Sequence, residues 1–231
     1  MGELFRFTGV RGGNAERAYT FTLHTGEMRI LQLDYGRAKS ELIDSAIGAT
    51  ACATGDIEVV QGDRRQKVAM IGKLGERRHV NGPVPLIWQP VAESRPGRVA
   101  WAAANGGLIS NLRIWENVTL PLWYHAHRNT AETEQRARHW LGMLGLAQDE
   151  FADFMVAEPH SVEPWQAKLA GLLRALLQMS PVLVVDAALF DDIKASTANC
   201  WIMALESYAA EGHAVLVMTD KAAALPWNKI E

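Results

Sequence analysis

Short apolar runs separated by glycine-containing turns open the chain. Strands are predicted over residues 4–7, 19–23 and 28–33, because β-favouring apolar residues recur within each run. A further strand is expected over 56–60. The stretch 64–98 contains four prolines, which neither donate to a ladder nor continue a helix. It therefore predicts an irregular excursion.

Helical periodicity dominates the second half of the chain and one segment near residue 40. The apolar residues of 40–51 fall on one side of a helix. Further helices are predicted over 112–124, 130–144, 161–179 and 193–210, and strands over 98–103, 181–186 and 213–218. Ser161 and Glu163 are candidate caps of the third of these helices. Strands that alternate with helices predict an α/β fold with a helical block in its middle.

Composition and charge exclude several classes of function. With 231 residues, 48% of them hydrophobic, the chain can bury one substantial core. Its net charge of -3 argues against nucleic acid as a partner. Cys52 and Cys200 fit no metal or redox spacing, and His125 and His127 have no third ligand nearby, so we expect a reduced cytosolic setting and no metal site.

The start lacks the apolar core of a signal peptide, and no run reaches the roughly 18 apolar residues that cross a bilayer. Any role at a membrane is therefore predicted to be peripheral.

One stretch indicates phosphate chemistry. Residues 33–40 read Leu-Asp-Tyr-Gly-Arg-Ala-Lys-Ser, between a predicted strand and a predicted helix. A phosphate loop has the pattern G-x-x-x-x-G-K-[ST], whose glycines let backbone N–H groups surround phosphate oxygens at a helix N-terminus. Lys39 and Ser40 fit this pattern, whereas Leu33 and Ala38 replace its outer glycines.

These departures leave two interpretations of the loop. Ala38 adds a Cβ where the backbone should approach phosphate, at a cost of about 1 kcal/mol if its φ is positive. Glu41 adds a negative charge beside the expected phosphates. Either Lys39 and Ser40 retain phosphate binding, or the loop is purely structural and Lys39 pairs with a carboxylate. The candidate carboxylates are those of Glu41, Asp34 and Asp186.

The order of features along nearly the whole chain resembles the ATP-binding subunit of ABC transporters. A Gly-Glu pair precedes the loop strand, and Gly36, Lys39 and Ser40 fall on three positions of the family's Walker A motif. Residues 107–122 contain Glu-Asn-Val-Thr-Leu-Pro-Leu, which is similar to importer and lipid-transport (Mla/Mce-type) ATPases. Residues 166–176 resemble the helix after the family's signature motif, and the run ending at Asp186 resembles Walker B.

The resemblance implies a single ABC-type nucleotide-binding domain over residues 1–231. Its P-loop (RecA-like) parallel core would comprise 1–104 and 176–231, with an N-terminal antiparallel β portion, and its helical subdomain about 105–175. ATP and Mg²⁺ would be its cofactors. A transmembrane permease would be its partner at the cytoplasmic face of the membrane, in a homodimer or in a heterodimer with another ATP-binding subunit. Trp115 and Trp123 would border the groove that receives the permease, or else serve in packing.

Several positions that carry the family's chemistry are changed in this chain. The Q-loop glutamine falls on Ala104, the general-base glutamate on Ala187, and the H-loop histidine on Thr219. The signature serine and glycines, which in the family hold the nucleotide of the opposite subunit, are replaced. The segment reads Val162, Glu163, Pro164, Trp165 and Gln166.

These changes predict little or no ATP hydrolysis. Loss of a positioned base typically costs about 10²–10⁴-fold in rate. Each site of a family dimer joins one subunit's Walker motifs to the other's signature, so both sites would be impaired even beside an intact partner. Asp186 would hold Mg²⁺ through water, or else pair with Lys39 or cap a turn at a strand end. Two alternatives stay open: a weak hydrolase with Asp191 or Glu163 as its base, and a scaffold unconnected to a transporter.

Overall fold

The computed structural model describes residues 2–11, 17–33, 36–50, 52, 54–61, 64–69, 99–125 and 130–220. The strands within these ranges are β1 (Glu3–Arg11), β2 (Tyr19–His24), β3 (Met28–Gln32), β4 (Thr54–Gln61), β5 (Arg64–Ala69), β6 (Val99–Ala102), β7 (Val182–Asp186) and β8 (Ala214–Thr219). The helices are α1 (Gly36–Ala46), α2 (Ile114–His125), α3 (Thr130–Met143), α4 (Phe151–Val156), α5 (Pro164–Leu177) and α6 (Ala195–Ala210), with short 3-10 turns η1 (Gln148–Glu150) and η2 (Ala187–Phe190). The predicted α/β class is confirmed.

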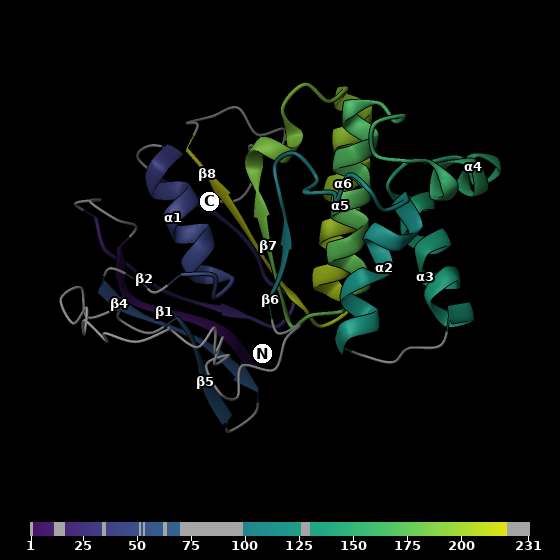
Figure 1. The fold of residues 1–231 in the computed structure, drawn as a ribbon. Coiled ribbons are helices and arrows are strands. Elements are labelled where there is room, and N and C mark those ends of the chain that lie inside the picture. The colour runs from purple at the N-terminus through teal and green to yellow at the C-terminus, as the bar shows by residue number, and fades with distance from the viewer. Residues whose placement is uncertain are drawn as a thin grey trace, which may run out of the picture.

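The strands form two separate sheets (Figure 1). The antiparallel sheet has the order β2-β1-β4-β5, and the parallel sheet has the order β3-β8-β7-β6. β8 lies between β3 and β7, so strands that are far apart in the sequence become neighbours. The antiparallel N-terminal portion and the parallel core predicted from the sequence are both present.

The two central strands of the parallel sheet, β7 and β8, are buried on both faces, which explains their apolar sequences. Along β7, Leu183 and Val185 face a cluster that includes α2, α3, α5 and α6. The alternate residues Val182 and Val184 face a second cluster, made with α1 and the antiparallel sheet. In Figure 1, α1 accordingly lies on one side of the parallel sheet, and the remaining helices lie on the other.

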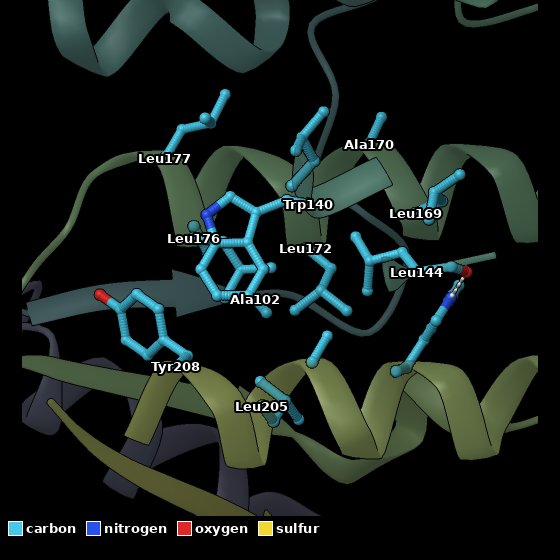
Figure 2. Packing of buried hydrophobic residues seen from close by; sticks show 14 of the residues in the cluster. Ala102, Trp140, Leu144, Leu169, Ala170, Leu172, Leu176, Leu177, Leu205 and Tyr208 are labelled. Carbon is cyan, nitrogen blue, oxygen red and sulfur yellow. Dashed lines mark hydrogen bonds between the residues drawn. The ribbon is translucent and has the colours of Figure 1, made fainter. Parts of the chain in front are cut away.

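Large aromatic side chains fill the centre of the helical cluster (Figure 2). Trp140 of α3 and Tyr208 of α6 are buried, with ring centroids 6.0 Å apart. The buried Trp201 donates its indole N–H to the carbonyl oxygen of Leu144 at 3.2 Å. This bond satisfies the one polar atom of the ring and fixes α6 against the end of α3.

A glycine pair joins α5 to the loop after β6. Gly106 has a φ of +80°, and a Cβ at Gly171 of α5 would collide with the backbone of Gly106. Arg174, one turn further along α5, donates to the carbonyl oxygens of Gly106 at 2.9 Å and Gly107 at 2.8 Å. The helix therefore touches this loop backbone to backbone, which only residues without a side chain allow.

Three local predictions were wrong in detail. α1 begins at Gly36, earlier than the predicted residue 40, and ends at Ala46, shortly before Gly48 with its φ of +78°. β5 forms where irregular structure was expected, because its residues pair with β4 in an antiparallel ladder. The rest of the expected excursion, 70–98, lies outside the described residues. The short helix α4 was not predicted, since six residues carry too little periodicity.

A stacked tyrosine–histidine pair connects α6 to the start of β8. The Tyr208 hydroxyl donates to the Ser180 carbonyl oxygen at 2.7 Å, and His213 Nδ1 lies 2.8 Å from the same oxygen. A carbonyl only accepts, so Nδ1 carries the proton of the neutral ring. Burial lowers the pKa of His213 below its ordinary value, although the Ser180 carbonyl and the charge of Glu211 oppose this shift.

The glycine contact gives a first prediction. Gly171→Ala should destabilise the protein by about 1–3 kcal/mol, because the added methyl overpacks a backbone contact. Gly142→Ala is the matched control, since a Cβ there meets nothing within 4 Å in helix α3. This control should be neutral or stabilising by up to about 1 kcal/mol. Denaturant unfolding of both variants measures the difference, and equal stabilities would show that the contact is not tight.

His213 gives a second prediction, on pH dependence. Because its pKa is lowered in the fold, its contribution to stability is fully present above the unfolded pKa of about 6.5 and is lost as the pH falls toward the folded value. His213→Asn keeps a donor but does not titrate, so the free energy of unfolding should fall less steeply between about pH 7.5 and 5. An unaltered slope in His213→Asn would disprove the assignment.

Candidate functional site

The candidate site lies at the carboxyl ends of β7 and β8, next to the first turn of α1. β3 leads toward α1 and pairs in parallel with β8, which in turn pairs with β7. Parallel strands end at a common edge, so Asp186 at the end of β7 and Asp220 just after β8 are brought together. The Leu33 N–H donates to the Thr219 carbonyl oxygen at 2.7 Å and holds the entry to α1 against β8.

Lys39 forms two ion pairs at this edge. Its Nζ lies 3.0 Å from Asp186 Oδ1 and 3.0 Å from Asp220 Oδ1. The Lys39 side chain is 9% exposed, and those of Asp186 and Asp220 are 15% and 25% exposed. Asp186 Oδ1 also accepts the N–H of Ala188 at 3.0 Å, which orients the carboxylate. The three charged groups form a lysine–aspartate triad.

Of the two carboxylate partners of Lys39, one was predicted and one was missed. Asp186 was a candidate partner of Lys39, and the structure places the two in contact. Asp220 was not considered, although it is the first acidic residue past the predicted strand 213–218. Its place after a parallel strand was the available signal, because such a residue reaches the same edge as Asp186.

The triad carries more negative than positive charge. Burial alone would lower the pKa of Lys39, but the hydrogen bonds and charges of Asp186 and Asp220 outweigh it and raise this pKa above its ordinary value. The ammonium therefore stays charged at neutral pH. Two carboxylates face one ammonium, which leaves the triad with a net negative charge.

The residues that replace the loop glycines belong to the apolar core. Leu33 is 2% exposed and packs in the cluster that contains Leu42 and Ile43. Ala38 is also buried, while Ser40 is exposed on α1. The side chain at position 33 thus contributes to packing between α1 and the sheets.

Glu41, another acidic partner proposed for Lys39, has a different partner in the structure. Glu41 pairs with Arg37, one helical turn before it, at 3.0 Å between Oε1 and Nε. The predicted pairing of Glu41 with Lys39 is therefore wrong, because the closer i,i+4 partner takes the carboxylate. Asp34 lies outside the described residues, and Gly36 is the first residue of α1.

The segment aligned with the signature motif forms an ordinary helix start. Glu163 precedes α5, Pro164 is its first residue, and the Gln166 side chain accepts the Glu163 N–H at 2.9 Å. Trp165 packs against the helical cluster. Ser161 was expected to cap α5, but its hydroxyl donates to the Glu158 carbonyl oxygen instead, so that prediction was wrong. α5 and α1 pack on opposite faces of the parallel sheet, so one chain does not bring this segment and Lys39 together.

A lysine of α5 reaches the turn that follows Asp186. Lys168 Nζ donates to the Asp191 carbonyl oxygen at 2.6 Å and to the Ala188 carbonyl oxygen at 3.4 Å. Ala187, between Asp186 and this turn, is buried. The contact fixes η2 against α5, and no sequence pattern had indicated it.

The Glu-Asn-Val-Thr-Leu-Pro-Leu segment lies within α2, and its first two residues stabilise the loop before the helix. Asn117 is fully buried, accepts the Ile109 N–H at 2.7 Å and donates to the carbonyl oxygens of Ile109, Leu112 and Arg113. Glu116 accepts the Arg113 N–H at 2.8 Å, as in a capping box. These two side chains therefore have a structural role.

The two tryptophans of α2 differ in exposure. Trp115 is partly buried against the helical cluster, whereas Trp123 is 65% exposed. Across the described ranges, no helix combines the length and apolar character needed to span a bilayer. In the same ranges, no three His, Cys, Asp or Glu side chains are grouped for a metal ion.

Comparison with solved structures places this arrangement among known folds. No protein-family model matches the sequence, and no curated protein matches it. A dimeric ATP-binding cassette in a post-hydrolysis state, bound to ADP and Pi, superposes with a TM-score of 0.70 at 18% identity over 94% of this chain and 88% of that one. An ATP-binding subunit of an ABC transporter gives 0.68 at 16% identity, over 94% of this chain and 79% of that one.

A third solved structure is an inward-facing putative metal-chelate type ABC transporter. It gives a TM-score of 0.63 at 14% identity over 96% of this chain and 74% of that chain. The chain therefore has the fold of an ABC transporter ATP-binding cassette, with its N-terminal antiparallel sheet and its P-loop-type parallel sheet. At identities of 14–18%, this likeness concerns the fold alone.

The Asn117 network gives a third prediction. Asn117→Ala should cost about 2–4 kcal/mol of stability, because it removes four hydrogen bonds to the backbone of the 109–113 loop and leaves a gap at a fully buried position. Trp123→Ala, on the exposed side of the same helix, should change stability by less than about 0.5 kcal/mol. Thermal and denaturant unfolding compare the two, and a neutral Asn117→Ala would show that the loop is held by other contacts.

Proposed function

We propose that this chain is a catalytically degenerate ATP-binding-cassette subunit of a membrane ABC transporter, with a structural or regulatory role. The observation that carries this proposal is the state of Lys39. The residue that would bind phosphate is held by Asp186 and Asp220 at 3.0 Å each. A cassette whose phosphate-binding cation is already neutralised can keep its shape without nucleotide.

A triphosphate fits the residues of this site poorly. To reach Lys39 it would displace two carboxylates, and each contact of unit charges at about 4 Å is worth about 4 kcal/mol at an effective dielectric constant of 20. The net negative charge of the triad would repel the phosphates as they approach. The buried Leu33 and Ala38 hold side chains where the Walker A pattern has glycine. ATP and Mg²⁺ are therefore doubtful cofactors.

The groups that would activate water are also missing from their expected positions. Ala187 follows Asp186, Ala104 follows the strand β6, and Thr219 ends β8. None of these side chains can act as a strong base or carry an amide or imidazole to the site. We therefore assign no catalytic residue.

In the proposed role the chain binds other subunits through its surfaces and does not hydrolyse ATP. We place a permease at the groove next to Trp115 and Trp123, and a second cassette, identical or related, at the face that contains Glu163 and Pro164. Residues of about 105–175 would form the helical subdomain that carries both surfaces, within a single cassette of residues 1–231. Binding at the cytoplasmic face of the membrane follows from a permease partner. A lipid is one candidate for the transported substrate, because the Glu-Asn-Val-Thr-Leu-Pro-Leu segment is similar to lipid-transport as well as importer ATPases.

The fourth prediction tests the nucleotide. Purified protein should hydrolyse Mg-ATP at a rate indistinguishable from Lys39→Ala, and ATP at millimolar concentration should not shift its melting temperature. Both results are expected because the Lys39 ammonium is already paired with Asp186 and Asp220. Hydrolysis that Lys39→Ala abolishes would instead establish the weak hydrolase of the alternative interpretation.

The same proposal is tested at its surface. Affinity purification from native membranes should recover a permease with several membrane-spanning segments, and Trp123→Ala should reduce that recovery. Met203→Ala is the control, because Met203 is 63% exposed on α6, compared with 65% for Trp123 on α2. Recovery of no membrane protein with the wild-type chain would favour a scaffold unconnected to transport.

A further inference from the structure

We propose that Asn105 and Gly106 form a modification site, at which Asn105 deamidates through a succinimide ring when Arg174 releases the loop after β6. Asparagine followed by glycine is prone to this reaction, because glycine has no side chain to obstruct the attacking nitrogen. Asn105 is exposed to solvent, whereas Gly106 is buried against α5. The inference depends on this loop and helix alone, and it stands whether or not the chain serves a transporter.

The reaction needs only the two residues and water. The backbone nitrogen of Gly106 gives its proton to solvent and attacks Cγ of Asn105. A C–N bond forms, and the side-chain amide nitrogen leaves as ammonia after taking a proton from solvent. Water then opens the five-membered ring at either carbonyl carbon. One product is aspartate at position 105, and the other is isoaspartate, in which the main chain runs through Cβ and Cγ.

The loop polarises the carbonyl that is attacked and restrains the nitrogen that attacks it. The Gly107 N–H donates to Asn105 Oδ1 at 3.0 Å, and a donor at this oxygen also stabilises the negative charge that forms there during the attack. The Gly106 N–H donates to the Ala103 carbonyl oxygen at 3.0 Å. This second bond must break before the nitrogen can lose its proton and turn toward Cγ, so the folded loop suppresses the reaction.

Arg174 holds the loop in this protected form. Its guanidinium donates to the carbonyl oxygens of Gly106 at 2.9 Å and Gly107 at 2.8 Å. A Cβ at Gly106 would collide with the Ala167 carbonyl group, so α5 leaves this backbone little room to turn. The Gly106 nitrogen becomes free only when Arg174 lets go. The rate of modification should therefore follow the population of the locally opened loop.

The two products should affect the contact with α5 differently. Aspartate at position 105 keeps an oxygen that can accept the Gly107 N–H and leaves the length of the main chain unchanged. Isoaspartate adds one carbon atom to the main chain directly before Gly106, which touches Gly171 backbone to backbone. The longer chain does not fit both the turn to Ala103 and this contact. Formation of isoaspartate therefore separates the loop from α5 irreversibly.

The experiment incubates the whole chain in buffer made with ¹⁸O-labelled water, well below its melting temperature. Tandem mass spectrometry of the tryptic peptide 99–113 measures aspartate and isoaspartate at position 105, apart from the second Asn-Gly pair of the sequence at 81–82. Each product formed in this way carries one ¹⁸O atom from the water that opened the ring. Wild type unfolded in urea gives the rate without the folded loop.

Three variants test the part of Arg174. Arg174→Ala removes two hydrogen bonds from a charged donor, so Asn105 should deamidate about tenfold faster or more than in folded wild type. Arg174→Lys keeps the charge with a single ammonium and should give an intermediate rate. Arg136→Ala is the matched control, because it removes an arginine of α3 that pairs with Glu132 at 2.8 Å. It should react like wild type.

Low concentrations of urea separate local from global opening. A loop that opens locally deamidates at a rate that urea barely changes, whereas global unfolding becomes steeply more frequent with urea. Hydrogen exchange of aged wild type should show lost protection within 99–113 in proportion to its isoaspartate content. Asn105→Asp should retain that protection.

Several results would overturn the inference. Folded wild type could deamidate at Asn105 as fast as the unfolded chain, or Arg174→Ala could react no faster than wild type. A rate in Arg174→Ala that rises steeply from the lowest urea concentration would show that the whole fold opens. Protection that survives isoaspartate formation would contradict the effect on α5. If Arg174→Ala does not fold, Arg174→Lys decides the matter, and a rate equal to that of wild type would then count against the inference.

Discussion

The edge of the parallel sheet where β7 and β8 end depends on one ammonium group. Lys39 enters this edge from α1 and contacts a carboxylate after each strand at 3.0 Å. Like charges on neighbouring strand ends repel, and the ammonium offsets this repulsion while it joins α1 to the sheet. The apolar side of α1, with Leu42 and Ile43, then completes the core between the two sheets. The site and the packing of the domain thus share one interaction.

Much of the fold could be predicted from the sequence because the signals were local and periodic. The run from Val182 to Asp186 indicated a strand buried on both faces, and the structure confirms this. The helical pattern of 130–144 predicted α3 almost to its ends. β5 was missed because its polar residues form a strand only through pairing with β4, which no local pattern encodes. α4 was missed because it is too short to show a period.

The candidate site was predictable only in part, for a similar reason. Lys39 and Asp186 stood out by motif, and their contact was one of several pairings considered. Asp220 joins them through the sheet order. β8 lies between β7 and β3, although the helices α1 to α6 separate β8 from β3 in the chain. The contact of Lys168 with the turn after β7 likewise depends on how α5 packs. Long-range partners follow from topology, which sequence periodicity does not specify.

The contact between Gly106 and Gly171 has a mechanical consequence. Because no side chain cushions it, and Arg174 clamps the loop from one turn further along, α5 and the segment after β6 must translate together. A displacement of α5 therefore carries the loop after β6 with it, because no side chain at this contact can rotate to absorb the motion. The domain would therefore move as one stiff body about this contact, whether or not nucleotide is hydrolysed at the edge of the sheet.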